Sequence, residues 1–342
     1  MRNPSRPRRP ILAAFAAFVA LVPSAHSEDP SSPLTFGTIE RLDARLDKLI
    51  PREAKLEKLA EGFDWSEGPA WDAREGRLLF SDVPQNTVFQ WKQGAGARPF
   101  LKPSGYTGTE PRGGEPGSNG LVFDPSGRLV LCQHGDRRVA RLVDGKFVTL
   151  ADRFDGKRFN SPNDATYSSK GDLFFTDPPY GLLKLNADPA KELPFNGVYR
   201  LAKGGELTLL TKAIPFPNGI ALSPDEKTLY VASSDPARAI WMAHDLKADG
   251  TIGEGRVFRD VTELGKRRKG LPDGMKVDRD GNLFATGPGG VLVFAADGTH
   301  LGTIGTGEAT ANCGWGDDGS TLYITADMYL CRIKTTTKGK GL

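Results

Sequence analysis

Apolar and polar residues follow one another along this chain in a phrase that returns six times. Each copy opens on an oxygen-bearing side chain. A short apolar run and a turn rich in Asp, Gly, Ser or Pro follow, and then a Leu starts a second apolar run, always ten or eleven positions after the opening residue. Copies spaced roughly 40–55 residues apart are typical of repeat arrays, and four-stranded blades around a channel fit this period. The pattern predicts an all-β fold, a six-bladed β-propeller with four-stranded blades. The opening residues are Glu67, Asn119, Asn163, Asn218, Asp273 and Asn312.

The shared register places the six opening residues at the same position in every blade, and so at one end of the predicted channel. The second strand of each blade runs back toward that end. The loops after it, such as residues 133–134 and 177–180, are therefore expected on the same face, where loops commonly carry function. The long insertion over residues 102–118, rich in Gly, Pro and charge, also leads into an opening residue. We expect it to form part of a wall or lid.

The residues before the first copy are expected to close the ring. Residues 28–53 look like a tether and a short helix, since apolar positions recur at three- and four-residue spacing over 38–49. Residues 54–60 alternate as a strand does, and the last copy lacks a fourth strand of its own. A strand supplied from the N-terminal side would complete the last blade and remove exposed edges. A single propeller domain is thus predicted over residues 54–338.

The first 27 residues have the pattern of a signal peptide. Four arginines precede an apolar run over residues 11–22, and Ala25-His26-Ser27 resembles a cleavage site. The run is too short for a transmembrane span. We expect export to the periplasm or the medium by the Sec route, or by a twin-arginine route if Arg8-Arg9 is read as that signal. No membrane attachment is expected after cleavage.

Net charge and cysteine content narrow the class of protein further. Without the leader's four arginines the net charge falls from +3 to about −1, so no nucleic-acid partner is expected. The basic run over 266–269 is interpreted as a solvated loop. The three cysteines permit one disulfide at most. A bridge between Cys313 and Cys331, which lie in the same copy, and a pair of ordinary buried thiols both remain open.

Several reaction types lack their motifs. The chain has no G-x-S-x-G elbow, no H-E-x-x-H pair and no phosphate-binding loop. After the leader, His134, His244 and His300 lie in three different copies, which gives a zinc site little support. A cluster of oxygen donors remains.

The oxygen donors suit a hard divalent cation. Glu67 and Asp273 would bring two negative charges, and Asn163 and Asn218 would bring neutral amide oxygens. Ca²⁺ is the first choice because it accepts irregular oxygen ligation, with Zn²⁺, Mn²⁺ and Mg²⁺ as alternatives. Such a cation polarises a carbonyl and activates water, as hydrolysis of an ester or lactone requires. The competing interpretation is that these Asn-Gly and Asp-Gly pairs are simply turns.

Longer phrases carry a family resemblance. SEGPAW (66–71), SNGLVFDPSGRL (118–129), HGDRRVARL (134–142), NSPNDATYSSKGDLFFTDPPYGL (160–182), PNGIALSPDEKTLYVA (217–232) and LPDGMKVDRDGNLFA (271–285) resemble the gluconolactonase/regucalcin (senescence marker protein)/luciferin-regenerating-enzyme-like family of six-bladed propellers. The resemblance implies one divalent metal in the channel and hydrolysis of sugar lactones to aldonic acids. It also implies metal ligation by Glu67, Asn163, Asn218 and Asp273.

The same resemblance marks Asp273 as the general base. The alternative is a metal-bound hydroxide nucleophile that Asp273 orients. By position, the side chains expected to hold the sugar hydroxyls are Asn119, His134, Arg158 and Tyr180. A structural role is the alternative for each of these. His134 would cap a loop, Arg158 would be solvated, and Tyr180 would pack under prolines.

Two further classes of function remain open. One is hydrolysis of a different ester or of an organophosphate at the same site, since a fold alone does not fix a substrate. The other is a non-enzymatic propeller that binds calcium or a protein. For the enzyme, the expected partner is a small sugar lactone, and the expected state is a monomer or weak dimer.

Overall fold

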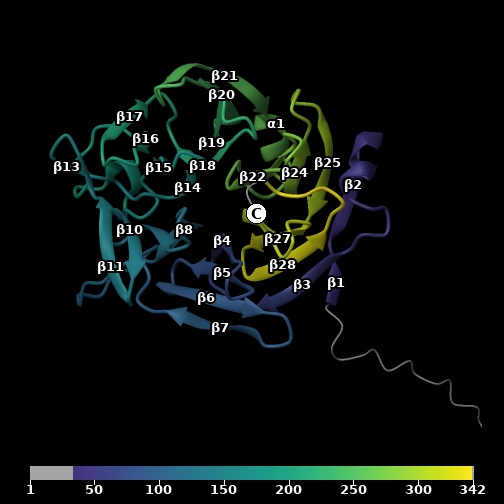
Figure 1. The fold of residues 1–342 in the computed structure, drawn as a ribbon, viewed down its shortest axis with the longest axis horizontal. Coiled ribbons are helices and arrows are strands. Elements are labelled where there is room, and N and C mark those ends of the chain that lie inside the picture. Colours follow the sequence, from purple (N-terminus) through teal and green to yellow (C-terminus); the bar gives the residue numbers. More distant parts are fainter. Residues whose placement is uncertain (1–33, 341–342) are drawn as a thin grey trace, which may run out of the picture. The chain divides into compact units, whose positions relative to one another are not determined.

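The computed structural model describes residues 34–340, which form six antiparallel sheets arranged as the blades of a propeller (Figure 1). The predicted fold class is confirmed. The signal peptide expected over residues 1–27 and the start of the tether lie outside the described residues. From the channel outward, each blade contains four strands in chain order, except that the last blade takes its fourth strand from the N-terminal side.

The strands occupy the following ranges. The innermost strands are β4 (Ser66–Asp72), β8 (Ser118–Phe123), β14 (Ala165–Tyr167), β18 (Pro217–Leu222), β22 (Met275–Val277) and β26 (Thr310–Gly316). The second strands are β5 (Arg77–Asp82), β9 (Leu129–Gln133), β15 (Leu173–Asp177), β19 (Thr228–Asp235), β23 (Leu283–Gly287) and β27 (Thr321–Ala326). The third strands are β6 (Thr87–Lys92), β10 (Arg138–Val143), β16 (Gly197–Leu201), β20 (Arg238–Leu246), β24 (Gly290–Phe294) and β28 (Tyr329–Lys334). The outer strands are β7 (Gly96–Leu101), β11 (Lys146–Ala151), β17 (Leu207–Thr211), β21 (Ile252–Asp260), β25 (His300–Gly305) and β3 (Leu56–Glu61).

A few short elements complete the list. Strands β1 (Leu34–Phe36) and β2 (Thr38–Arg41) add a fifth strand to the blades of β26 and β22, respectively. Strands β12 (Arg153–Phe154) and β13 (Lys157–Arg158) form a separate hairpin. The helical elements are the 3-10 helices η1 (Ala44–Lys48) and η2 (Leu185–Ala187) and the one-turn helix α1 (Thr262–Gly265). In residues 34–340 no helix has both the length and the apolar character needed to span a membrane.

Strand β3 closes the ring as predicted. It pairs antiparallel with β28, with Leu330 opposite Ala60 and Arg332 opposite Glu57. An ion pair between Arg332 and Glu57, 2.7 Å long, joins the same two strands. Figure 1 shows β3 (purple) beside β28 (yellow). The outer edge of β28 is therefore paired, and β1 in turn pairs with part of β3.

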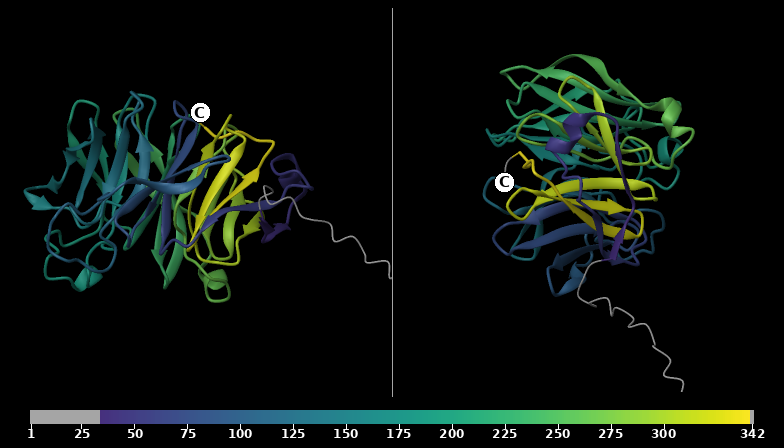
Figure 2. Two further views of the ribbon diagram at one scale, coloured as in Figure 1. Left: turned by 90° about the horizontal axis from the view of Figure 1, so that it is seen from below. Right: turned by 90° about the vertical axis from the view of Figure 1, so that its right-hand side faces the viewer.

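The prediction of an amphipathic helix over residues 38–49 is wrong for the first part of this range. Residues 38–41 form β2, which pairs with β25, and Figure 2 shows this purple segment along the yellow-green strands. Pairing satisfies the backbone hydrogen bonds that a helix would have supplied. The helical spacing that prompted the prediction belongs to η1 and the turn after it, where Leu46, Leu49 and Ile50 are buried.

The repeated Leu of the sequence phrase packs between blades. All six copies, Leu78, Leu129, Leu173, Leu229, Leu283 and Leu322, are at most 6% exposed. One apolar cluster, for example, joins Leu79 of β5 to Leu121 and Leu131 of the neighbouring blade. The hydrophobic core is thus distributed over the spaces between blades, and each blade is stabilised by its two neighbours.

The glycine after an opening residue serves inter-blade packing. Gly219 follows Asn218 inside β18, and a Cβ atom there would overlap the backbone carbonyl of Asp273 on the next blade. Asn218 is the second residue of that strand and not part of a turn. The turn interpretation of this pair therefore does not hold. The missing side chain lets two innermost strands approach at the channel.

Cys132, Cys313 and Cys331 are buried free thiols. Cys313 and Cys331 lie on β26 and β28, and both face Ile324 of the strand between them. Two strand spacings amount to about 10 Å, which exceeds the reach of a disulfide. Of the two alternatives left open by the sequence, the structure has the pair of buried thiols.

The closing strand can be tested through its core contact. Leu56 of β3 is 1% exposed and packs in the cluster that joins the last two blades. Leu56→Ala should lower the free energy of unfolding in urea by about 2–5 kcal/mol because it leaves a cavity. Leu34→Ala, on β1 with 64% of its surface exposed, is the matched control and should change it by less than about 0.5 kcal/mol. Equal effects of the two variants would contradict closure through β3.

Candidate active site

A cavity of about 500 Å³ lies at the end of the channel where the innermost strands begin. Five of the six opening residues line it. Its other walls come from connections between blades: Trp65, the 102–117 insertion with Glu115, and the loop over 265–271. Tyr180 and Ser234 complete the lining from the ends of second strands. The opening residues in the cavity wall are Glu67, Asn119, Asn163, Asn218 and Asp273.

Glu67 is placed by the start of β4. Its side chain is buried, with only 2% of the residue exposed, and its Oε2 accepts a 2.9 Å hydrogen bond from the backbone N–H of Gly68. A hydrogen bond from the side chain of Asn312 also favours the ionised carboxylate, and no arginine or lysine in residues 34–340 forms an ion pair with it. Glu67 is therefore a buried, uncompensated carboxylate facing a cavity.

A hydrogen-bonded chain through Ser234 links two ligand candidates on neighbouring blades. The Nδ2 of Asn218 donates to Ser234 Oγ over 2.9 Å, and that hydroxyl donates to the carbonyl of Pro272 over 2.5 Å. Pro272 directly precedes Asp273. The amide nitrogen of Asn218 is thus engaged on the protein side, which leaves its oxygen for the cavity.

The loop that carries Asn163 is held by a buried carboxylate. Asp177, at the end of β15, accepts hydrogen bonds from the backbone N–H groups of Asn160 and Ser161 at 2.9 and 2.8 Å. Ser161 Oγ then donates to Pro178 O and accepts from Gly181 N. Burial raises the pKa of Asp177 to about 7, and the two N–H donors oppose this rise. These contacts bring Asn163 and Tyr180 to the same cavity.

His134 stands behind Asn163. Its Nε2 lies 3.4 Å from Asn163 Nδ2, and its Nδ1 lies 3.4 Å from Glu115 Oε2. The side chain is completely buried and is not among the residues that line the cavity. His134 therefore contacts a predicted ligand and a cavity-wall carboxylate, and it is not placed to reach a sugar hydroxyl directly.

Negative charge accumulates at this end of the channel. Burial raises the pKa of Glu67 to about 8, and the nearby carboxylates of Asp164 and Glu115 add to the rise. Burial also holds the pKa of Asp273 well above its usual range, reinforced by Glu67, Asp164 and Glu115. Buried charges without partners are costly, so the site favours either protons or a bound cation.

The polar atoms left unpaired here show what an occupant must supply. Asn119 Oδ1, Asn163 Oδ1, Asp273 Oδ1 and the Tyr180 hydroxyl are buried, line one cavity and have no hydrogen-bond partner. Three of the four are pure acceptors. Carboxylate and amide oxygens with free lone pairs fit a hard divalent cation, so the residues present fit the metal expected from sequence. Within residues 34–340 no group of three His, Cys, Asp or Glu could hold a metal; the candidate site depends on its amides.

The structure brings together most of the predicted site residues. The four predicted metal ligands, Asn119 and Tyr180 line the cavity. Arg158 is elsewhere: its guanidinium donates to the carbonyl of Asp136 over 2.9 Å. The sixth opening residue, Asn312, also lies outside the lining, and its Oδ1 accepts from the N–H of Cys313.

Several cavity residues were missed by sequence reasoning. Trp65 and Ser234 flank recognised phrases, so their position next to an opening residue or at a strand end was the available signal. Glu115 lies in the insertion, for which a wall was expected but no residue was chosen. Arg268 and Lys269 of the basic run also line the cavity, where they pair with Glu40 and Glu308.

Comparison with known proteins agrees with this architecture. Residues 65–327 match the SMP-30/Gluconolactonase/LRE-like region. A gluconolactonase from Zymomonas mobilis is 41% identical over 313 residues, which cover 89% of this chain and 88% of the relative. The solved structure of a gluconolactonase from Xanthomonas campestris superimposes with a TM-score of 0.78 at 33% identity, covering 89% of this chain and 97% of that one. A calcium-binding regucalcin from Agrobacterium tumefaciens, 21% identical with a TM-score of 0.65 over 83% of this chain and 94% of its own, shares the fold.

The fold and the cavity define a six-bladed propeller enzyme of the lactonase class. The chain belongs to the SMP-30/gluconolactonase/LRE-like family.

The buried charge predicts a pH-dependent stability of the cation-free protein. The pKa of Glu67 rises from 4.5 to about 8 on folding, so the folded state holds a proton that the unfolded state releases between these values. The free energy of unfolding in urea with a chelator should therefore fall as the pH rises from about 5 to about 8.

Glu67→Gln removes that group and should make the decline shallower. Glu254→Gln, at an exposed position on β21, is the control and should retain the wild-type slope. If Glu67→Gln and wild type show the same decline, Glu67 is not a buried carboxyl of raised pKa.

Proposed function

We propose that this protein hydrolyses a sugar lactone of the gluconolactone type to its aldonic acid, in the cavity at the channel mouth. The observation that carries the proposal is the group of four unpaired, buried polar atoms converging on that cavity. The 41% identity to a gluconolactonase supports the same reaction. We further propose that the protein acts after export, in the periplasm or outside the cell, because residues 1–27 have the pattern of a signal peptide.

The cation site comprises Glu67, Asn163, Asn218 and Asp273, with Ca²⁺ as the first choice among hard divalent ions. A bound divalent cation would polarise the lactone carbonyl and stabilise the negative charge that develops on its oxygen. The two carboxylates would balance its charge, and Asn218 is already oriented by Ser234. His134 keeps the amide of Asn163 in place from behind.

Asp273 acts as the general base in this proposal. Its Oδ1 is unpaired, so that oxygen is free to accept a proton from a water molecule in the cavity. It takes a proton from the water whose oxygen bonds to the carbonyl carbon. The bond from that carbon to the ring oxygen then breaks, and the proton passes to the departing ring oxygen as it becomes a hydroxyl group. The new carboxylic acid ionises in solution.

Asn119 and Tyr180 position the substrate. The hydroxyl of Tyr180 is the donor among the four unpaired atoms, and burial raises its pKa so that it stays protonated. Its ring stacks on Phe216 with centroids 6.2 Å apart, which fixes the direction of the hydroxyl. Asn119 Oδ1 is available to accept from a hydroxyl of the sugar. His134 and Arg158 do not line the cavity and are left out of direct substrate contact.

The reaction is tested by pH-stat hydrolysis of δ-gluconolactone, with spontaneous hydrolysis subtracted. Protein stripped of metal should be inactive, and Ca²⁺, Zn²⁺, Mn²⁺ or Mg²⁺ is then added back. Asp273→Asn should lower kcat about a hundredfold or more even at saturating cation, the usual scale of general-base loss. Glu67→Gln should chiefly raise the cation concentration needed for half-maximal rate.

Glu254→Gln is the control for removal of a negative charge, and its rate of lactone hydrolysis and its cation requirement should match those of wild type. Folded, cation-binding protein that hydrolyses the lactone no faster than buffer would refute the proposed reaction. Full activity of Asp273→Asn would refute the assigned base.

A further inference from the structure

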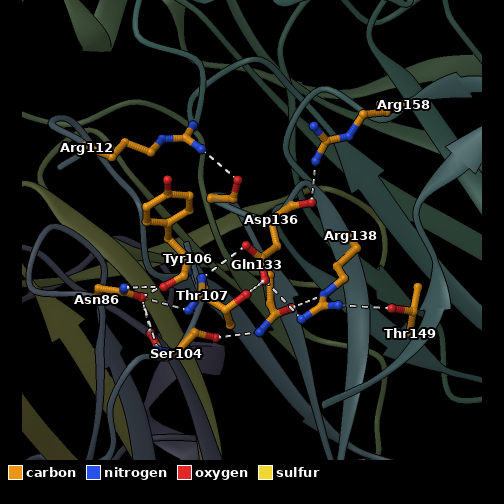
Figure 3. A network of polar contacts seen from close by, with 12 residues as sticks. Asn86, Ser104, Tyr106, Thr107, Arg112, Gln133, Asp136, Arg138, Thr149 and Arg158 are labelled. Carbon is orange, nitrogen blue, oxygen red and sulfur yellow. Dashed lines mark hydrogen bonds and ion pairs between the residues drawn. The ribbon is translucent and has the colours of Figure 1, made fainter. Parts of the chain in front are cut away.

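The insertion between β7 and β8, residues 102–117, is a firmly docked segment of the cavity wall. Asn86 Oδ1 accepts from the backbone N–H groups of Ser104, Gly105 and Tyr106 at 3.0, 2.8 and 3.1 Å, and Asn86 Nδ2 donates to Tyr106 O. Gln133 Nε2 donates to Ser104 O over 2.8 Å. Figure 3 shows this part of the insertion held between Asn86 and Gln133.

A second set of contacts ties the insertion to the turn after β9. Thr107 donates to the carboxylate of Asp136 through its N–H and its hydroxyl, at 3.1 and 2.8 Å. Arg112 donates to the backbone carbonyls of Gly135 and Gly181, the second of which lies beside Tyr180. Figure 3 shows Arg112 and Thr107 converging on this turn. The insertion thus bridges three blades at the rim of the cavity.

The same turn fixes the backbone directly after Glu115. Gly135 N donates to Pro116 O and His134 N donates to Gly117 O, both over 3.1 Å. A side chain at Gly135 would collide with Tyr106 and with the Pro116 carbonyl, so close docking requires glycine there. Glu115 is therefore held in a defined position on the wall.

The carboxylate of Glu115 is available to the cavity. One oxygen lies 3.4 Å from His134 Nδ1, and 35% of the side chain is exposed. Within residues 34–340 it forms no ion pair with lysine or arginine. A carboxylate has about four acceptor sites, so most of its capacity is unused.

We propose that Glu115 is a specificity residue that accepts hydrogen bonds from ring hydroxyls of the lactone, which selects polyhydroxylated lactones over unsubstituted ones. This inference rests on the proposed function of the site. The buried atoms of the cavity present the unpaired acceptor oxygens of Asn119, Asn163 and Asp273 against a single unpaired donor hydroxyl, while the cations of the wall, Arg268 and Lys269, already pair with Glu40 and Glu308. A well-matched occupant therefore brings several donors of its own. Hydroxyl groups supply them, whereas an alkyl lactone would leave these acceptors unsatisfied.

The position of Glu115 separates this role from cation binding. The predicted cation ligands are opening residues of the inner ring, whereas Glu115 comes from the insertion and contacts the ring through His134. A residue that binds the ring hydroxyls equally in the ground state and the transition state should change binding and discrimination and leave the chemical step intact.

The test compares two lactams that resist hydrolysis: one with the hydroxyl groups of δ-gluconolactone, and unsubstituted δ-valerolactam. Calorimetry with cation-loaded protein measures both affinities. Wild type should prefer the hydroxylated lactam, and Glu115→Ala should weaken that affinity about tenfold with little effect on δ-valerolactam. Glu115→Gln, which keeps one acceptor oxygen, should lie between them. Glu110→Gln, an exposed position on the same insertion, is the matched control and should behave as wild type.

The kinetic counterpart is a rise in KM for δ-gluconolactone in Glu115→Ala with kcat changed by less than about twofold. Equal weakening of both lactams would show a merely structural role, and unchanged affinity for both would show no role; either result overturns the proposal. Because lactam binding is independent of turnover, discrimination that depends on Glu115 supports the inference even if lactone hydrolysis fails. If wild type hydrolyses the lactone but Glu115→Ala does not change the discrimination between the two lactams, this inference is overturned and the proposed function stands.

Discussion

The crowding of uncompensated negative charge at one end of the channel is the constraint around which the site is organised. Glu67 and Asp164 are buried, Asp273 lies half-buried near them, and Glu115 adds a further carboxylate from the wall. Such charges are tolerated in a protein interior only when protons or a counter-ion offset them. The propeller supplies the rigid frame that prevents them from moving apart. A bound proton or cation would relieve the cost of this arrangement in stability, and this supports the cation site that we propose.

The frame depends on close contact between the innermost strands. Gly219 lets the strand of one blade approach the backbone beside Asp273 of the next, and Ser234 connects the same two blades through Asn218 and Pro272. Each ligand is therefore positioned by the blade that carries it and by a neighbour. In contrast, the recognition wall is added from outside the ring, by an insertion that docks on the turn after β9. In the function that we propose, chemistry and specificity thus come from separate parts of the chain.

The sequence predicted the ring and its closing strand because both depend on periodic patterns. The six phrases share a register, so Glu67 and Asp273 could be placed at one end of the channel before the fold was known. Asn312 follows the same pattern, but its side chain turns to the N–H of Cys313, a local choice that no spacing reveals. His134 and Glu115 meet only because the insertion docks. Residues 38–41 became a strand because β25 offered an edge, which local spacing could not show.

The closure of the ring also bears on how the protein is made. Glu57 and Arg332, which join β3 to β28, are 275 positions apart in the chain. A chain that emerges from the ribosome N-terminus first must keep β3 unpaired until the last blade has been synthesised. Until then it exposes a free strand at one end and an unfinished blade at the other, which are the edges that invite aggregation and proteolysis. Contacts so distant in sequence also slow folding. The pairing of β3 with β28 therefore requires the last strand of the last blade, and a chain that ends before β28 could not close the ring.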